Sequence, residues 1–417
     1  MKNSRLVAFE ILSRVLRENA YSNIAVDSAL KNNDVENKAF VSTLVYGVVE
    51  RKLTLDYIID RFLTSKNIKS KVRILLYIGA YQLYFMDKVP PRVALYETVE
   101  LSKQIGTSRY QGLVNAVLHK IDANRIDIDA FENLSIKYSC PENLINMWTK
   151  MYTRENTLKI LECINDRPPV FAIPNRLYVD EEELQYELEG CNISGEIVDG
   201  AVLITSGFDL TNCKAFDDGL FYIEDLSSYR CAEALGAAAG DTVLDVCSAP
   251  GGKAFSIAQG MKNEGTVYAY DLYEHRVRLI ESGAKRLGIK IIQAGVNDAA
   301  EYNKDIPMAD KILCDVPCSG FGIIRRKPEI RYKELDSIAD LPDIQYKILS
   351  TSSAYLKNGG KMIYSTCTLN KKENEKVVNK FLESNSGFKL IEEVTIFPSA
   401  NAGDGFYYAV LEKNEGH

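Results

Sequence analysis

Two cysteines and an aspartate stand where the chain could perform nucleophilic chemistry. Asp315 ends the apolar run at 311–314, Cys318 follows three residues later, and Cys367 ends a second run at 360–366. Such runs predict buried strands. A lone cysteine in an α/β core is ordinarily a packing residue. Two cysteines at the ends of adjacent predicted strands, one of them beside a carboxylate, instead favour a catalytic role in covalent attack and proton transfer.

A glycine-rich loop that precedes these residues is typical of a ligand site. The apolar run 242–244 leads to Asp245, and a helical pattern begins near Ala254. The glycines allow close approach of the backbone, and the helix N-terminus offers free amide groups. The loop lacks G-x-G-x-x-G, so it is no dinucleotide fingerprint, and a plain strand-to-helix turn is the alternative. The predicted cofactor-binding residues here are Cys247, Ser248, Ala249, Pro250, Gly251, Gly252 and Lys253.

Carboxylates also follow the next two predicted strands. Asp271 ends the strand at 266–271, and a strand at 290–293 leads to Asp298. In nucleoside-binding doubly wound folds, an acid at the first position hydrogen-bonds ribose hydroxyls. A carboxylate at the second could meet an adenine amino group, with a helix cap as the alternative. Because ligands bind at the carboxyl ends of the strands, Asp271, Asp298 and Asp315 are predicted to line one cofactor site.

The periodicity of the chain predicts a multidomain fold in three parts. Residues 1–130 repeat apolar side chains at helical spacing and predict an all-α domain of five or six helices. Residues 131–232 alternate short strands with helices, which predicts a small α/β (RRM-like) subdomain. Residues 233–417 predict a doubly wound, Rossmann-like α/β domain that begins near the glycine-rich loop.

The net charge of −7 is unevenly distributed. Residues 1–130 carry 19 Lys and Arg against 14 Asp and Glu, whereas residues 131–240 carry 8 against 19. A positive helical domain is compatible with binding nucleic acid. Nine cysteines without paired spacing and three scattered histidines predict free thiols, no metal site and a cytoplasmic protein. No apolar run is long enough to suggest a membrane partner, and a monomer is expected.

Three segments of the C-terminal part resemble the RNA cytosine-C5 methyltransferases. They are Asp245-x-Cys247-Ser248-Ala249-Pro250-Gly251-Gly252-Lys253, Asp315-x-Pro317-Cys318-Ser319-Gly320-x-Gly322 and Ser365-Thr366-Cys367-Thr368. In the N-terminal part, residues 93–100 and Gly112-Leu113-Val114-Asn115-Ala116-Val117-Leu118 resemble the NusB-type RNA-binding domain. Joined in one chain, these motifs resemble the bacterial RsmB (Sun/Fmu) family of 16S ribosomal RNA methyltransferases.

This resemblance implies a role for each residue of the site. The implied methyl donor is S-adenosylmethionine, and Cys367 is the implied nucleophile that adds to C6 of a cytosine. Asp315 would hydrogen-bond the ring nitrogen N3, and Cys318 would assist the later elimination. The implied target is cytosine 967 of 16S ribosomal RNA.

A basic run follows the second motif and is expected to contact RNA phosphates. Its predicted RNA-binding residues are Arg325, Arg326, Lys327 and Arg331, and a solvated loop is the alternative. Two other functions stay open. A DNA cytosine-C5 methyltransferase would use Cys318 as its nucleophile, but the added helical domain argues against a DNA partner. A non-catalytic RNA-binding factor would not need Cys367 or an intact glycine-rich loop.

Overall fold

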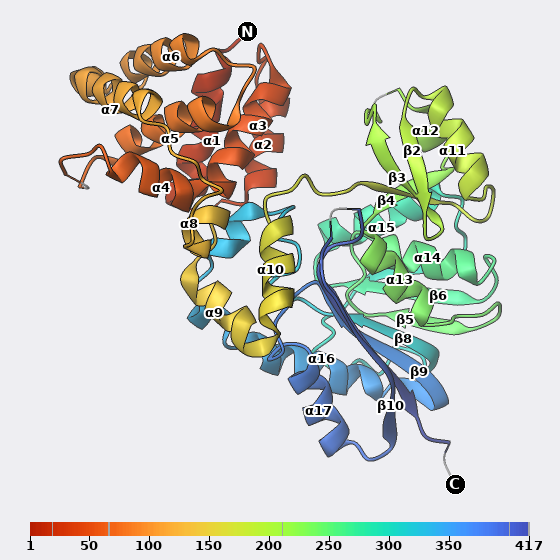
Figure 1. The fold of residues 1–417 in the computed structure, drawn as a ribbon. Helices are drawn as coiled ribbons and strands as arrows, with labels where there is room; N and C mark the ends of the chain where they lie inside the picture. Colours follow the sequence, from red (N-terminus) through yellow and green to blue (C-terminus); the bar gives the residue numbers. More distant parts are fainter. Residues whose placement is uncertain (19, 66, 211, 400, 416–417) are drawn as a thin grey trace. The chain divides into compact units, whose positions relative to one another are not determined.

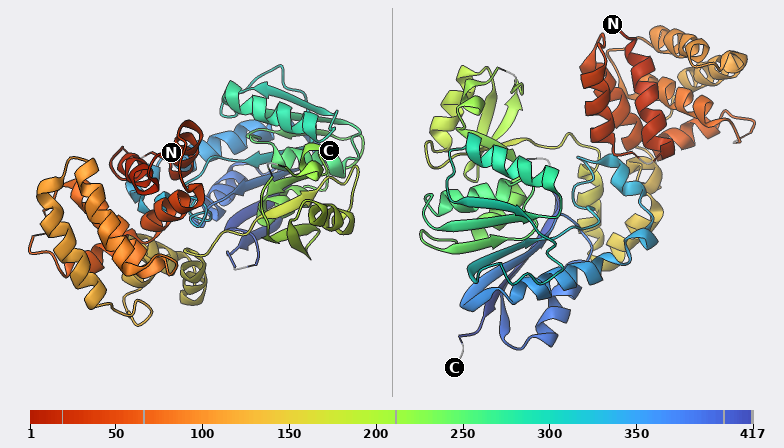
Figure 2. Two further views of the ribbon diagram at one scale, coloured as in Figure 1. Left: turned by 90° about the horizontal axis from the view of Figure 1, so that it is seen from above. Right: turned by 180° about the vertical axis from the view of Figure 1, so that it is seen from behind.

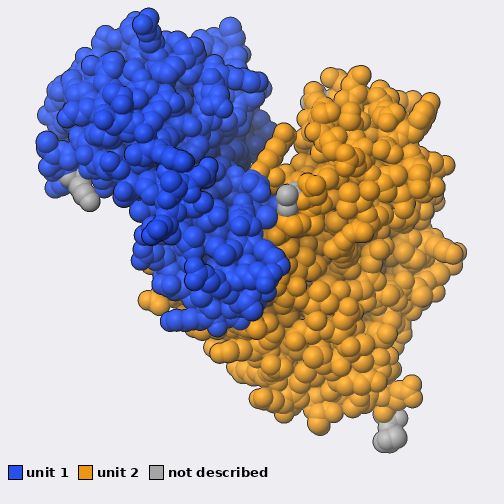
Figure 3. Space-filling view, in the orientation of Figure 1, with its two compact units in different colours: residues 1–166, 324–333 blue, residues 167–323, 334–417 orange. Residues whose placement is uncertain are grey.

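The protein consists of two compact units, which are coloured separately in Figure 3. The computed structural model describes residues 1–18, 20–65, 67–210, 212–399 and 401–415. The first unit comprises residues 1–166 and 324–333, and the second comprises residues 167–323 and 334–417. None of the helices in these described ranges is long and apolar enough to cross a membrane.

The first unit is built from helices around α5 (Figure 1). Its first helices are α1 (Ser4–Glu18), α2 (Ser22–Asn32), α3 (Lys38–Glu50), α4 (Lys52–Asp60), α5 (Ser70–Phe85), α6 (Pro91–Gln104), η1 (Ser108–Tyr110) and α7 (Gln111–Ala123). Within the described part of 1–123 there are thus seven α-helices, where five or six were predicted. Helix α5 is buried along most of its length, since α1, α3, α4, α6 and α7 pack around it.

Residues 131–166 extend this helical unit, and their assignment to the α/β subdomain was wrong. They form α8 (Leu134–Tyr138), α9 (Glu142–Met151) and α10 (Arg154–Cys163). Helix α8 is bonded to α4: the Thr54 hydroxyl donates to the Ile136 carbonyl at 2.5 Å, and Leu53 N–H donates to Ser139 Oγ at 2.9 Å. The sequence pattern changes near residue 131, but hydrogen bonds and packing between distant segments place the end of the helical unit near residue 166.

The small α/β subdomain occupies residues 171–224. Its elements are β1 (Phe171–Pro174), α11 (Glu181–Gly190), β2 (Ser194–Val198), β3 (Ala201–Ser206), α12 (Lys214–Asp217) and β4 (Phe221–Glu224). The antiparallel sheet order β2-β3-β1-β4 with this βαββαβ connection is ferredoxin-like. Because strand residues alternate, Ala172 and Val202 pack toward α11 and α12, whereas Phe171 and Ile173 join the core of the larger domain.

A seven-stranded sheet forms the centre of the second unit (Figure 1). Its strands are β5 (Thr242–Asp245), β6 (Thr266–Asp271), β7 (Ile292–Val296), β8 (Ala309–Asp315), β9 (Leu356–Thr366), β10 (Phe388–Ile396) and β11 (Phe406–Lys413). The order is β10-β11-β9-β8-β5-β6-β7, with β5 to β9 parallel and β11 antiparallel to β9 and β10. Strand β7 covers 292–296 rather than the predicted 290–293.

Helices cover both faces of this sheet (Figure 2). One face packs on α13 (Leu226–Ala234), α14 (Gly252–Gly260) and α15 (Glu274–Arg286), and the other on α16 (Leu341–Ser353) and α17 (Glu375–Ser384). Adjacent residues such as Val243 and Leu244 enter opposite cores, so the strands read as continuous apolar runs. This arrangement brings the ends of β5, β8 and β9 together, since these strands are neighbours and parallel.

Candidate active site

A cavity of about 630 Å³ lies beside the loop from β5 to α14. Of the predicted cofactor-binding residues, Cys247, Ser248, Ala249, Pro250, Gly252, Lys253 and Asp315 line it, together with the buried Asp245. Gly251 has φ +112°, a left-handed conformation that favours glycine, and it precedes the first turn of α14. The loop is thus a strand-to-helix turn that also borders a cavity large enough for a nucleoside-sized ligand.

Asp315 and Lys253 form an ion pair at the end of β8. Lys253 Nζ lies 2.8 Å from Asp315 Oδ2, and the Ser365 hydroxyl donates to Asp315 Oδ1 at 2.9 Å. Burial alone would lower the pKa of Lys253, but the negative charges of Asp315 and Glu224 raise it above its ordinary value. Lysine therefore stays charged and orients the aspartate, whose side chain keeps 27% of its surface exposed.

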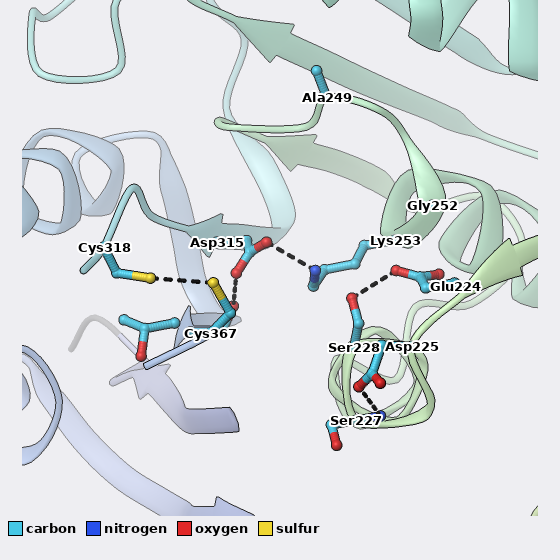
Figure 4. A network of polar contacts seen from close by, with 12 residues as sticks. Glu224, Asp225, Ser227, Ser228, Ala249, Gly252, Lys253, Asp315, Cys318 and Cys367 are labelled. Carbon is cyan, nitrogen blue, oxygen red and sulfur yellow. Dashed lines mark hydrogen bonds and ion pairs between the residues drawn. The ribbon is translucent and has the colours of Figure 1, made fainter. Parts of the chain in front are cut away.

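The two predicted catalytic thiols face each other next to Asp315 (Figure 4). Cys318 Sγ and Cys367 Sγ are 3.3 Å apart, and both residues are partly buried. The hydrogen bond with Cys367 and burial raise the pKa of Cys318 well above its ordinary value. Cys318 is therefore held as a neutral thiol that can donate to the sulfur of Cys367.

Backbone contacts hold the loops after the two cysteines together. Gly322 N–H donates to the carbonyl of Cys367 at 3.0 Å, and Gly405 N–H donates to the carbonyl of Gly322 at 3.0 Å. A Cβ on Gly322 would overlap the carbonyl oxygen of Gly405. Only glycine permits this approach, so the residues before β11 help to set the position of both thiols.

A half-buried carboxylate that the sequence analysis missed lies on the other side of Lys253 from Asp315. Glu224 ends β4, accepts a hydrogen bond from the Ser228 hydroxyl at 2.6 Å, and lines the cavity (Figure 4). Burial raises its pKa to about 7. The signal was present in the sequence: Phe221-Tyr222-Ile223-Glu224 is one more apolar run that ends in an acid.

Asp245 is the most deeply buried acid of the site. It is fully buried, and neither carboxylate oxygen has a hydrogen-bond partner among the described residues. Burial raises its pKa to about 7. The folded protein thus binds a proton at this position that the unfolded chain releases near pH 4.

Replacing Asp245 with asparagine is expected to stabilise the cofactor-free protein more at pH 8 than at pH 5. The raised folded pKa means that the contribution of Asp245 to stability is present below about pH 4 and lost as the pH rises to about 7. Asparagine does not titrate, so the difference in the free energy of unfolding should grow by roughly 1 kcal/mol or more across this window. Urea denaturation at both pH values measures it, and an equal difference at pH 5 and pH 8 contradicts the assignment.

The acids after β6 and β7 take different positions. Asp271 is buried, accepts a hydrogen bond from Ala249 N–H at 3.2 Å, and lies 3.2 Å from Nη1 of Arg276. It therefore supports the glycine-rich loop. Asp298 is exposed and accepts a hydrogen bond from Ala300 N–H at 2.9 Å, as a local cap would. Neither residue lines the 630 Å³ cavity.

The prediction that Arg331 contacts RNA was wrong. Its side chain is 1% exposed, and its guanidinium donates to the carbonyl oxygens of Glu50, Ser139 and Ile164 at 2.9, 3.2 and 3.0 Å. These carbonyls stand at the C-terminal ends of α3, α8 and α10, where backbone acceptors lack helical partners. Arg331 instead connects three helices of the first unit, because the N–H donors of its guanidinium group can hydrogen-bond to these carbonyl oxygens at the same time.

The other basic residues of this run differ in exposure. Arg325 is 4% exposed and thus also unavailable as a surface cation. Arg326 and Lys327 are half-buried, and they remain the predicted contacts of this run with RNA.

Family models match two separate parts of the chain. The model of the 16S rRNA methyltransferase RsmB/F family matches residues 232–412, and that of the NusB family matches residues 2–123. The probable ribosomal RNA small subunit methyltransferase B of Bacillus subtilis is 36% identical, with 98% of each chain covered. The ribosomal RNA small subunit methyltransferase B of Photorhabdus laumondii is 31% identical, with 99% of each chain covered.

Solved structures share the fold. The crystal structure of PH0851 covers 99% of this chain and of its own, with a TM-score of 0.82 and 25% identity. NSun6 from Pyrococcus horikoshii covers 66% of this chain and 99% of its own, with a TM-score of 0.58 and 22% identity. The agreement over nearly the whole length shows that this chain belongs to the family of ribosomal RNA small subunit methyltransferases B and methylates ribosomal RNA with S-adenosylmethionine as donor.

Proposed function

We propose that the enzyme methylates C5 of a cytosine in 16S ribosomal RNA, with cytosine 967 as the target. The observation that carries this proposal is the pair of thiols 3.3 Å apart beside Asp315. Methyl transfer to an oxygen or an exocyclic nitrogen needs no thiol, because those atoms carry lone pairs. A ring carbon such as C5 is a poor nucleophile and needs covalent activation.

Cys367 provides that activation. Its thiolate forms a bond to C6 of the base, and the ring electrons become available at C5 as an enamine. The proton that Cys367 loses on becoming a thiolate is taken up by N3 as C6 is attacked, and the resulting N3–H donates a hydrogen bond to the Asp315 carboxylate, which stabilises the protonated ring. When bound, S-adenosylmethionine supplies the electrophilic methyl group. Lys253 and Ser365, which occupy both carboxylate oxygens of Asp315, hold the aspartate in place for this contact.

Cys318 acts in the second half of the reaction. After C5 has accepted the methyl group, its proton must leave and the bond between Cys367 Sγ and C6 must break. Cys318, whose sulfur lies 3.3 Å from that of Cys367, assists this elimination: its thiol proton passes to Cys367 Sγ as the bond to C6 breaks, and the thiolate left on Cys318 takes the proton from C5. The target base has to be unpaired or flipped out of a helix to reach these thiols.

The cofactor is held by the loop after β5 and by acids at the strand ends. The residues that line the cavity, Cys247 to Pro250 with Gly252 and Lys253, would bind the donor, with Gly251 shaping the turn. Asp271 would bind the ribose and Asp298 the adenine. The buried, unpartnered oxygens of Asp245 fit a polar ligand in the cavity, because buried polar atoms ordinarily have partners.

Replacing Asp271 with alanine is expected to weaken cofactor binding by about 1–3 kcal/mol. The change removes the proposed ribose acceptor and the support of Ala249 N–H, while RNA affinity stays close to wild type. Calorimetric titration with S-adenosylmethionine measures the loss. Glu274→Ala is the matched control, because that carboxylate is nearby but exposed. An unchanged affinity for the cofactor would remove Asp271 from the site.

Two measurements test the proposed reaction as a whole. Purified protein, 16S ribosomal RNA and labelled S-adenosylmethionine should give label in RNA. Bisulfite sequencing should then show one cytosine that resists conversion to uracil, because methylation at C5 protects cytosine from bisulfite. Label that is found on another base, or on a cytosine that bisulfite still converts, would contradict methylation at C5.

A further inference from the structure

Glu373 is a fully buried carboxylate just before α17 that no step of the reaction uses. Its Oε1 accepts hydrogen bonds from the Ser319 hydroxyl at 2.6 Å and Asn370 Nδ2 at 2.7 Å. Its Oε2 accepts from Ser319 N–H at 2.8 Å and Gln345 Nε2 at 3.0 Å. Within the described residues it has no ion-pair partner. Four neutral donors therefore stabilise one buried charge.

The donors belong to the segments that carry the two thiols. Ser319 follows Cys318 directly, and Asn370 lies three residues after Cys367. The Ser319 hydroxyl is also 2.7 Å from Thr368 Oγ1, which accepts a hydrogen bond from Phe321 N–H at 3.1 Å. The carboxylate thus connects the loop after β8 to the loop after β9 through atoms one to three residues from each sulfur.

The third segment is helix α16. Gln345 Nε2 donates both to Glu373 and to the carbonyl of Pro317, at 3.0 Å each. Pro317 immediately precedes Cys318, and Ser319 follows it. Helix α16 therefore holds the residue before the cysteine, while Glu373 holds the residue after it. Burying an unpaired charge is costly, and an apolar side chain would fill the space at lower cost in a purely structural role.

We propose that Glu373 is the positioning residue that sets the separation and orientation of the Cys318 and Cys367 thiols. It does so by accepting hydrogen bonds from both loops and from α16 at once. Its negative charge also adds to the causes that keep the pKa of Cys318 raised, after the hydrogen bond to Cys367 and burial. The roles of the thiols rest on the proposed function, whereas their spacing does not.

Glu373→Gln is the test, because it keeps the shape and replaces one acceptor oxygen with an NH₂ group. In the wild-type protein each carboxylate oxygen of Glu373 accepts two hydrogen bonds. In either orientation of the glutamine amide, the NH₂ group therefore faces two donors and can accept from neither. Disulfide formation between Cys318 and Cys367 with a diazenedicarboxamide oxidant reports the thiol geometry without RNA or cofactor. The two thiols lose two hydrogen atoms to the N=N bond, which becomes a hydrazine, and mass spectrometry follows the product over time.

We expect Glu373→Gln to change the rate of this cross-linking, and to slow formation of the covalent RNA adduct, by roughly 10- to 100-fold. Calorimetric affinity for S-adenosylmethionine should stay within about twofold, because Glu373 does not line the cavity. Glu383→Gln makes the same change on an exposed residue of α17 and should match wild type. The double variant Asn370→Asp/Glu373→Gln exchanges donor and acceptor and should recover much of both rates.

Cross-linking and adduct rates in Glu373→Gln that equal those of wild type overturn the proposal, and so does a folded double variant that recovers neither. If Glu373→Gln does not fold, Ser319→Ala removes only the hydroxyl donor and should show a smaller change in the same direction. A Cys318→Ala protein that forms no RNA adduct, alongside a wild-type protein whose cross-linking depends on Glu373, contradicts the proposed function and supports the positioning role.

Discussion

Replacing Cys367 with alanine is expected to abolish both methyl transfer and the covalent complex with RNA. Within the described residues, only Cys318 has its sulfur next to that of Cys367, and its raised pKa disfavours the thiolate that attack requires. Loss of covalent catalysis should reduce the rate by several orders of magnitude. Transfer of label from S-adenosylmethionine to 16S ribosomal RNA measures activity, and a denaturing gel shows the protein–RNA complex.

Replacing Cys318 with alanine is expected to give the opposite pattern on the gel. Cys367 can still attack C6, but elimination lacks the thiol that faces it, so the covalent complex accumulates with unmodified RNA. Cys314→Ala is the matched control, since that cysteine lies on β8, the strand that precedes Cys318, and is fully buried in the core. If Cys318→Ala prevents the complex and Cys367→Ala traps it, the roles are reversed, as a DNA-type mechanism would require.

Replacing Arg331 with methionine is expected to destabilise the first unit by about 3–5 kcal/mol. The change leaves backbone carbonyls at the ends of α3, α8 and α10 without their donor, as breaking a buried charged network does. Trp148, the single tryptophan of the chain, is fully buried on α9 in this unit. Its fluorescence therefore reports unfolding of the first unit in urea.

Lys327→Met is the matched control, because the residue lies in the same loop but is only half-buried. It should change stability by about 0.5 kcal/mol or less and should weaken RNA binding and its dependence on salt. Arg331→Met should retain the salt dependence of wild type below its unfolding transition. A stable Arg331→Met protein with reduced RNA affinity would restore the sequence-based interpretation of Arg331 as a phosphate contact.

Much of the catalytic centre could be predicted from the sequence. Apolar runs that end in Asp245, Asp315 and Cys367 predicted neighbouring parallel strands, and these strands are neighbours. The reason is that a parallel sheet buried on both faces needs apolar residues at successive positions, whereas its polar side chains collect where the strands end. Local chemistry also specified the glycine-rich turn and the capping box of α11, in which Asp180 and Glu183 bond to each other's backbone N–H groups.

Only the tertiary structure decided which charged residues are buried and what they bind. Arg331 and Lys327 are four residues apart in one basic run, yet Arg331 lies among three helix ends while Lys327 is half-buried. Glu373 likewise looks like an ordinary surface acid in the sequence. The burial of a charge depends on donors and acceptors from segments distant along the chain, such as Ser319 and Gln345 for Glu373. Periodicity and composition are local properties, and they carry no information about such partners.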